Sequence, residues 1–340
     1  MDKILFNGQE VKTFTLKNEH IALICSNYGA KIISIKLQKN KDSYLEIVGG
    51  YDQMSQYLGG KQSFGAICGQ YANRIAKGKF SLGGKSFQCD QNNNEHCLHG
   101  GKEGLYRLMW DVIDSDDQNI HFRILLKDGH MGFPGNVAID FYIKLEDHTI
   151  QLNYTATTDA DTIINIATHS YFNLNGFGDI LNHKLQLNSD CITPIDNTCI
   201  PTGEYYLVDS TPFDFRESKH IGKEINVKDE QLIFGNGYDH NFVLDKRHSS
   251  ELAAELIGDI SNLRMRLYCS QPGLQFYTCN WPGSEIEIGK NNQEYKRHSF
   301  VCLEPQHYPD SPNQKHFPNT ILRKNEVYSH WVKYEFDWLK

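Results

Sequence analysis

Apolar and polar residues alternate in short runs along most of the chain, and this period of two predicts β-strands. Gly, Asn and Asp residues separate the runs, as is typical of turns between strands, and Asn7-Gly8 is a hairpin signal. At most a short helix is expected, near residues 51–58. The clearest strand-like runs are 4–6, 11–16, 21–25, 31–37, 121–126, 137–143 and 149–154. The pattern therefore predicts an all-β fold of the sandwich type.

The sequence contains no sign of a domain boundary. No linker rich in proline, serine or glycine divides it, and its composition does not shift along the chain. A length of 340 residues would ordinarily suggest about two domains, but large all-β folds are an exception to that rule. Because no fixed-period repeat is present either, we expect residues 1–340 to form a single domain.

The charge balance bears on the kind of partner. The chain has 34 Lys and Arg residues against 42 Asp and Glu residues, and its net charge is −8. It has no basic cluster that could neutralise a phosphate backbone, so we expect no nucleic-acid partner. No apolar run approaches the roughly 20 residues of a membrane span, so we expect no membrane partner.

Cysteine and histidine usage bears on location and cofactors. The chain has 9 cysteines without a Cys-x-x-Cys pair, and its N-terminus lacks the pattern of a signal peptide. These features predict a reduced, cytoplasmic protein. None of the 15 histidines lies in a His-x-His or His-Glu-x-x-His motif, so we expect no metal site. The sequence also lacks a Gly-x-Gly-x-x-Gly motif, a Walker loop and a Gly-x-Ser-x-Gly motif, which argues against a nucleotide cofactor and a serine hydrolase.

A stretch near the C-terminus is the first candidate for chemistry. Residues 300–303 resemble the end of a buried strand, and the next segment has prolines at 305, 309 and 312. Prolines exclude a regular helix and fix much of the backbone, so we expect Glu304 at the junction of a strand and a stiff loop. A carboxylate held in this way suits a general base. The alternative is a loop glutamate that caps backbone amides.

His169 is the second candidate. It lies in Thr168-His169-Ser170-Tyr171, which follows an apolar run and precedes Phe172. We expect the imidazole to be half-buried between aromatic side chains, with one ring nitrogen hydrogen-bonded and a proton affinity near neutrality. Such a group suits a general acid, although a core histidine with satisfied hydrogen bonds would give the same pattern.

Further polar residues stand at turns elsewhere in the chain. Asn73 and Arg74 lie between small residues, and the Arg74 guanidinium could bind an oxygen-rich ligand or pair with an acid. His99 precedes two glycines, where a backbone or ligand can approach closely. Asp239 follows turn glycines, and Gln275 lies beside aromatic residues in a predicted strand. Amides, acids and aromatic rings together indicate a pocket for a sugar, while Glu304 with Asp239 could instead serve a glycosidase.

These stretches together resemble the aldose 1-epimerases, also called galactose mutarotases. The matching segments follow the family's order between about residue 65 and residue 322, and they are 71–78, 98–101, 169–174, 237–241, 272–277 and 304–313. The resemblance implies a large β-supersandwich, no cofactor, and interconversion of the α and β anomers of hexoses such as galactose and glucose. It also implies a small-molecule aldohexose as the partner, and we expect a monomer or weak homodimer.

The resemblance further implies roles for individual residues. Glu304 matches the family's general base and His169 its general acid. Residues that match sugar contacts or their supports are Asn73, Arg74, His99, Tyr171, Asp239 and Gln275. Whether His99 is a second acid or only a contact stays open, as does the preferred aldose.

The sequence departs from the family's pattern at two positions. Gln70 stands where many relatives have arginine, and Thr168 stands where asparagine is frequent. Because both residues flank functional positions, they put orientation and substrate preference in question. The alternatives that remain are a sugar-binding protein without catalysis, a glycoside hydrolase and a hexose-6-phosphate epimerase. The last would need a basic cluster, and only Arg74, Lys77 and Lys79 are near.

Overall fold

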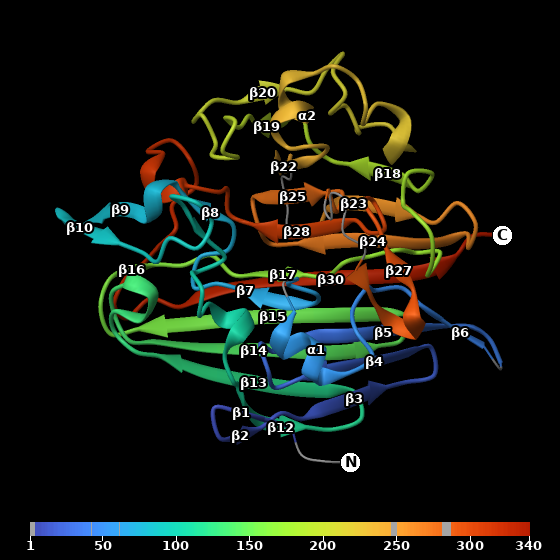
Figure 1. Ribbon diagram of the computed structural model, residues 1–340, viewed down its shortest axis with the longest axis horizontal. Coiled ribbons are helices and arrows are strands. Elements are labelled where there is room, and N and C mark those ends of the chain that lie inside the picture. Colours follow the sequence, from blue (N-terminus) through green and yellow to red (C-terminus); the bar gives the residue numbers. More distant parts are fainter. Residues whose placement is uncertain (1–3, 42, 61, 246–249, 281–286) are drawn as a thin grey trace.

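The computed structural model describes residues 4–41, 43–60, 62–245, 250–280 and 287–340. Residues 1–3 of the predicted single domain therefore lie outside the described residues, while the first predicted strand, 4–6, lies within them. Strands dominate the architecture, as the alternating pattern predicts (Figure 1). No helix in the described part of the chain has the length and apolar character needed to cross a membrane.

The largest sheet is antiparallel and has nine strands (Figure 1). Two of its long central strands pair over ten residues. Apolar and polar residues alternate along these strands, which places the apolar side chains on one face of the sheet. In spatial order its strands are β12 (Asp111–Ser115), β13 (Asn119–Leu126), β14 (Val137–Glu146), β15 (Thr149–Thr158), β30 (Tyr328–Trp338), β24 (Leu263–Cys269), β23 (Leu252–Ile257), β18 (Lys184–Leu187) and β21 (Lys219–His220).

Two smaller antiparallel sheets share a hydrophobic core with the large one. One cluster of buried residues contains Leu23 of the four-stranded sheet, Phe276 of the five-stranded sheet and Phe141 of the large sheet. The four-stranded sheet contains β3 (Thr13–Lys17), β4 (Ile21–Ser26), β5 (Ile32–Asn40) and β6 (Ser43–Glu46). The five-stranded sheet contains, in order, β20 (Tyr206–Leu207), β19 (Cys191–Thr193), β22 (Asp239–Val243), β25 (Gly273–Tyr277) and β28 (Cys302–Gln306).

The remaining described strands form two-stranded pairs. The hairpin predicted at Asn7-Gly8 joins the first pair. The pairs are β1 (Leu5–Phe6) with β2 (Gln9–Glu10), β7 (Ala66–Cys68) with β17 (Ala167–His169), β8 (Arg74–Ile75) with β11 (Cys97–Leu98), β9 (Lys79–Leu82) with β10 (Lys85–Gln88), β16 (Thr162–Ile163) with β29 (Ile321–Leu322), and β26 (Glu287–Ile288) with β27 (Glu294–Tyr295).

Helices are short. The expected one is α1 (Met54–Gly59), which inserts Tyr57 into a buried aromatic cluster. Pattern reasoning missed α2 (Glu230–Phe234), whose N-cap Asp229 accepts hydrogen bonds from two backbone N–H groups. Single 3₁₀ turns occur at Ala76–Gly78, Leu105–Arg107, His130–Gly132, Ile221–Lys223, Lys290–Asn292 and Ser311–Asn313. The last begins beside Pro312, so prolines exclude only longer helices there, because proline is tolerated in a first turn.

Candidate active site

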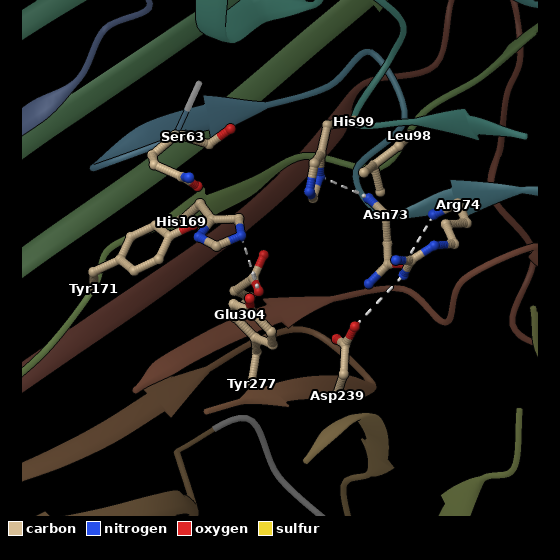
Figure 2. Close-up of a pocket in the computed structure, with 11 residues that line it drawn as sticks. Ser63, Asn73, Arg74, Leu98, His99, His169, Tyr171, Asp239, Tyr277 and Glu304 are labelled. Carbon is tan, nitrogen blue, oxygen red and sulfur yellow. Dashed lines mark hydrogen bonds and ion pairs between the residues drawn. The ribbon is translucent and has the colours of Figure 1, made fainter. Parts of the chain in front are cut away.

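The candidate residues meet in one pocket of about 220 Å³ (Figure 2). All of the residues predicted from the sequence line this pocket except Gln275. The described lining residues are Gln62, Ser63, Asn73, Arg74, Leu98, His99, His169, Tyr171, Asp239, Tyr277 and Glu304. Segments far apart in the sequence thus build a single polar site.

The five-stranded sheet supplies one wall of the pocket. Because side chains alternate across a sheet, Phe276 of β25 enters the hydrophobic core while Tyr277 lines the pocket. The register pairs Asp239 of β22 with Tyr277, and Gln275 of β25 with Glu304 of β28. One face of this sheet therefore carries the acids and amides.

The structure corrects the predicted position of Glu304. It lies in the middle of β28, inside the strand rather than at the junction with a loop. The following Pro305 is compatible with a strand here because β28 is the outermost strand of its sheet, where a missing N–H need not break a ladder. Strand pairing therefore fixes the backbone of Glu304, and burial confines its side chain.

A β-bridge brings His169 next to Glu304. Phe172 and Val301 exchange two backbone hydrogen bonds, at 2.8 and 2.9 Å, in antiparallel orientation. His169 lies three residues before Phe172, and Glu304 lies three residues after Val301. Antiparallel pairing therefore sets His169 opposite Glu304. The Nε2 of His169 lies 3.6 Å from the Oε1 of Glu304.

His169 is more deeply buried than the sequence predicts. Only 5% of the residue is exposed, and its ring stacks on Tyr171 at a centroid distance of 4.8 Å. Burial lowers the pKa of His169 to about 4, well below neutrality. The expected hydrogen bond to one ring nitrogen is also not found among the described residues. The buried Nδ1 has no partner there, and Nε2 faces Glu304 at 3.6 Å.

The pKa of Glu304 is shifted in the opposite direction. Burial, with the nearby Asp239 carboxylate as the second cause, raises the pKa of Glu304 well above its usual value, and Arg74 opposes this. Its Oε2 is buried and has no hydrogen-bond partner in the described part of the chain. Glu304 therefore does not cap backbone amides. Since buried polar atoms in folded proteins nearly always have partners, this carboxyl group is available to a ligand.

His99 is fixed as a neutral hydrogen-bond donor. Its Nδ1 accepts a hydrogen bond of 3.2 Å from the backbone N–H of Asn73, so Nε2 carries the proton. Burial lowers the pKa of His99 well below its usual value, and the charges of His169 and Arg74 add to the effect. The following Gly100 has φ of 86°, and a Cβ there would lie 2.0 Å from the Gly69 carbonyl oxygen. The close approach expected at the glycines is thus between the backbones of Gly100 and Gly69.

Arg74, Asp239 and Gln275 form a connected polar group on the other side of the pocket. Nη1 of Arg74 lies 3.8 Å from Oδ2 of Asp239, and Nε2 of Gln275 donates a 2.7 Å hydrogen bond to Oδ1 of Asp239. Burial raises the pKa of Asp239, while Arg74 and Gln275 lower it. Gln275 lies outside the described pocket lining and is 2% exposed, so it contacts Asp239 rather than the cavity.

The two departures from the family's pattern point away from the pocket. Gln70 donates hydrogen bonds to the Thr162 hydroxyl (2.8 Å) and the Ile163 carbonyl (2.9 Å). The Thr168 hydroxyl bonds to the hydroxyl of Tyr154. Neither residue belongs to the described lining. Both therefore act on packing around the site and touch nothing in the cavity.

Sequence reasoning missed some of the lining residues. Tyr277 could have been found, since it lies two positions after Gln275 in a strand and so shares its face. Gln62 and Ser63 carry no motif, and only the folded chain brings them to the pocket. Among the described residues, the group of side chains spaced to hold a metal ion lies elsewhere, at His20, Asp147 and His148.

Known proteins match this chain over most of its length. The profile of the family described as aldose 1-epimerase matches residues 12–335. The galactose mutarotase of Bos taurus is 34% identical over 330 residues, covering 96% of this chain and 94% of that protein. The aldose 1-epimerase of Escherichia coli K12 is 32% identical over 336 residues, covering 97% of this chain and 96% of that protein.

Solved structures show the same fold. The aldose epimerase homologue from C. elegans superposes with a TM-score of 0.90 at 25% identity, covering 97% of this chain and 100% of that one. The galactose 1-epimerase from Lactobacillus acidophilus superposes with a TM-score of 0.86 at 24% identity, covering 99% of this chain and 97% of that one. The predicted all-β, galactose mutarotase-like fold is confirmed. The chain belongs to the aldose 1-epimerase family.

Proposed function

We propose that this protein is an aldose 1-epimerase that interconverts the α and β anomers of hexoses such as galactose and glucose. The observation that carries the proposal is the buried pair of Glu304 and His169, 3.6 Å apart in a pocket lined by polar and aromatic side chains. In this role Glu304 is the general base and His169 the general acid. Both are uncharged when the proton of the pair resides on Glu304, which is the form that burial favours.

The mechanism uses one proton that moves between the two groups. Before the sugar reacts, this proton passes from Glu304 to His169, which leaves Glu304 ionised and His169 protonated. Glu304 takes the proton of the anomeric hydroxyl, His169 gives its proton to the ring oxygen, and the bond between that oxygen and C1 breaks. The open aldehyde rotates about the C1–C2 bond. Glu304 then returns a proton to the C1 oxygen and His169 takes one from the sugar hydroxyl, so that the ring closes on the other face.

The remaining lining residues orient the sugar. His99 donates from Nε2, Arg74 donates from its guanidinium, and Asp239 accepts from sugar hydroxyls. Gln275 holds the Asp239 carboxylate in place through the 2.7 Å hydrogen bond, so its contribution is indirect. Tyr171 and Tyr277 supply aromatic surface for the C–H edges of the ring.

A hexose 6-phosphate is a poor match for this pocket. Arg74 is the cationic side chain among the described lining residues, and it already faces Asp239. A phosphate group carries a charge of about −1.5 to −2 at pH 7. It would meet the carboxyl groups of Asp239 and Glu304 without a cation of its own. A neutral sugar meets no such repulsion.

Polarimetry tests the proposal. We expect freshly dissolved α-D-galactose or α-D-glucose to reach anomeric equilibrium faster with the protein than without it, because ring opening gains acid and base assistance. A disaccharide incubated with the protein should release no new reducing sugar. No acceleration with either hexose would contradict the epimerase assignment, and release of reducing sugar would support a glycoside hydrolase instead.

The proposal also predicts the pH dependence of kcat/KM, which reports the ionisation of the free enzyme. The reactive pair holds one proton. Below the pKa of about 4 for His169, a second proton binds and activity falls. Above the raised pKa of Glu304, the pair loses its proton and activity falls again. We therefore expect a bell-shaped profile with an acid limb near pH 4, measured with galactose. An acid limb near the usual histidine value of 6.5 would contradict the assignment.

A further inference from the structure

Two histidines and an aspartate gather on the surface, away from the pocket. His20 belongs to the turn between β3 and β4, while Asp147 and His148 form the turn between β14 and β15. The Oδ1 of Asp147 lies 3.2 Å from the Nε2 of His20 and 3.9 Å from the Nε2 of His148. One ligand atom from each residue lies within 4.8 Å of the others.

The backbone holds these three residues in position. The Asn18 side chain donates a 2.8 Å hydrogen bond to the Asp147 carbonyl, and its oxygen accepts one of 2.9 Å from the His20 N–H. The His148 carbonyl accepts a 3.0 Å bond from the N–H of Phe336. Each turn is thus tied to its surroundings, and Asn18 joins the two turns directly. A ligand bound by all three side chains would not need to order the backbone first.

The side chains themselves can adjust. Their exposed fractions are 30% for His20, 47% for His148 and 73% for Asp147. The two imidazole rings stack with centroids 3.8 Å apart and planes at 21°. Donor atoms on one tetrahedral zinc ion lie about 3.3 Å apart, given bonds of about 2.0–2.2 Å. The 3.2 Å separation of His20 and Asp147 matches this value. His148 would have to turn out of its stack on His20 to direct its ring nitrogen at the same ion, and its exposure leaves room for that rotation.

We propose that His20, Asp147 and His148 bind one divalent transition-metal ion of the zinc type. Imidazole and carboxylate ligands suit Zn²⁺, Ni²⁺ or Cu²⁺, whereas Mg²⁺ and Ca²⁺ require a shell of oxygen ligands. Three protein ligands leave the remaining position to water. The site is separate from the pocket, and the epimerase chemistry proposed above does not depend on it.

The ion would link two sheets. The turn with His20 belongs to the four-stranded sheet, and the turn with His148 belongs to the nine-stranded sheet, and both sheets appear in Figure 1. They already share a core, in which Phe14 of β3 packs edge-on against Phe122 of β13 at 6.2 Å. Because the ligands converge only in the folded chain, the ion binds the native state in preference to the unfolded one. Metal binding should therefore raise the temperature of unfolding.

Calorimetric titration of the tag-free protein with ZnCl₂ tests the proposal. We expect one zinc ion per chain, and we expect His148→Ala and His20→Ala each to weaken binding about tenfold or more, since even loss of an outer-shell partner costs about 10–100-fold. His148→Cys should retain binding because thiolate is also a zinc ligand. With zinc at about 100 times its Kd, the unfolding temperature of the wild type should rise by roughly 2–4 °C.

Controls separate this site from other surface histidines. His220, an exposed histidine of β21, serves as the matched control, and His220→Ala should bind zinc as the wild type does. Polarimetry should give equal rates for His148→Ala and the wild type. The proposal is wrong if zinc does not bind, if MgCl₂ binds equally well, or if His20→Ala and His148→Ala leave affinity and unfolding temperature unchanged.

Discussion

Replacing Glu304 by glutamine should lower the enzymatic rate of mutarotation by about 10²–10⁴-fold, the usual contribution of a positioned general base. Glutamine has nearly the same shape, but it cannot take the proton of the anomeric hydroxyl. Because the proposed sugar contacts of Arg74, Asp239 and His99 remain in this variant, the loss should appear in kcat much more than in KM. Polarimetry on α-D-galactose, corrected for spontaneous mutarotation, measures the difference. Activity within about tenfold of the wild type would rule out Glu304 as the base.

Stability provides the control for this variant. A carboxyl group whose pKa is raised in the folded state contributes stability that is fully present below its unfolded pKa and is lost as the pH rises through the folded pKa. Glu304→Gln should therefore unfold at the same temperature as the wild type or higher at pH 7, and the advantage should shrink near pH 4. Glu294→Gln, at an exposed position in β27, should change neither the rate of mutarotation nor the unfolding temperature. A lower unfolding temperature for Glu304→Gln at pH 7 would mean that the carboxyl group supports the fold.

Sequence periodicity predicts the strands of this fold well, because burial of one sheet face requires apolar residues at every second position. The strands β4, β14 and β15 and the short helix α1 lie where the pattern places them. The partition into sheets could not be predicted. Nothing local indicates that β30, at the C-terminus, pairs with both β15 and β24 in the middle of the largest sheet. That pairing depends on contacts between residues far apart in the sequence.

The site was predictable in its residues but not in its geometry. Motifs name His169 and Glu304, whereas the bridge of Phe172 with Val301 that sets them side by side joins segments distant in the chain. The burial of His169 also depends on segments distant in the chain. This burial lowers the pKa of His169 to about 4, whereas the sequence predicts a value near neutrality. Gln275 shows that a motif can identify a residue without giving its role. A motif identifies it, but its hydrogen bond to Asp239 shows that it supports a lining residue and does not line the pocket.

Replacing His169 by alanine should reduce the enzymatic rate by about 10²–10⁴-fold, because the ring oxygen would leave without a proton donor. The small side chain also opens space beside Tyr171, where the imidazole ring stacks in the wild type. Added imidazole should enter this space and restore part of the rate in proportion to its concentration. A purely structural role for His169 would give no such recovery, so rescue separates proton transfer from packing.

His99 is the matched control, since it lies 5.4 Å from His169 between ring centroids and lines the same pocket. Its Nδ1 accepts the Asn73 N–H, and burial lowers its pKa, so in the proposed mechanism it donates a hydrogen bond and exchanges no proton. His99→Gln should accordingly raise KM for galactose and lower kcat by no more than about tenfold. Equal losses of kcat in His99→Gln and His169→Ala, with no rescue by imidazole, would transfer the role of acid to His99 and leave His169 as a packing residue.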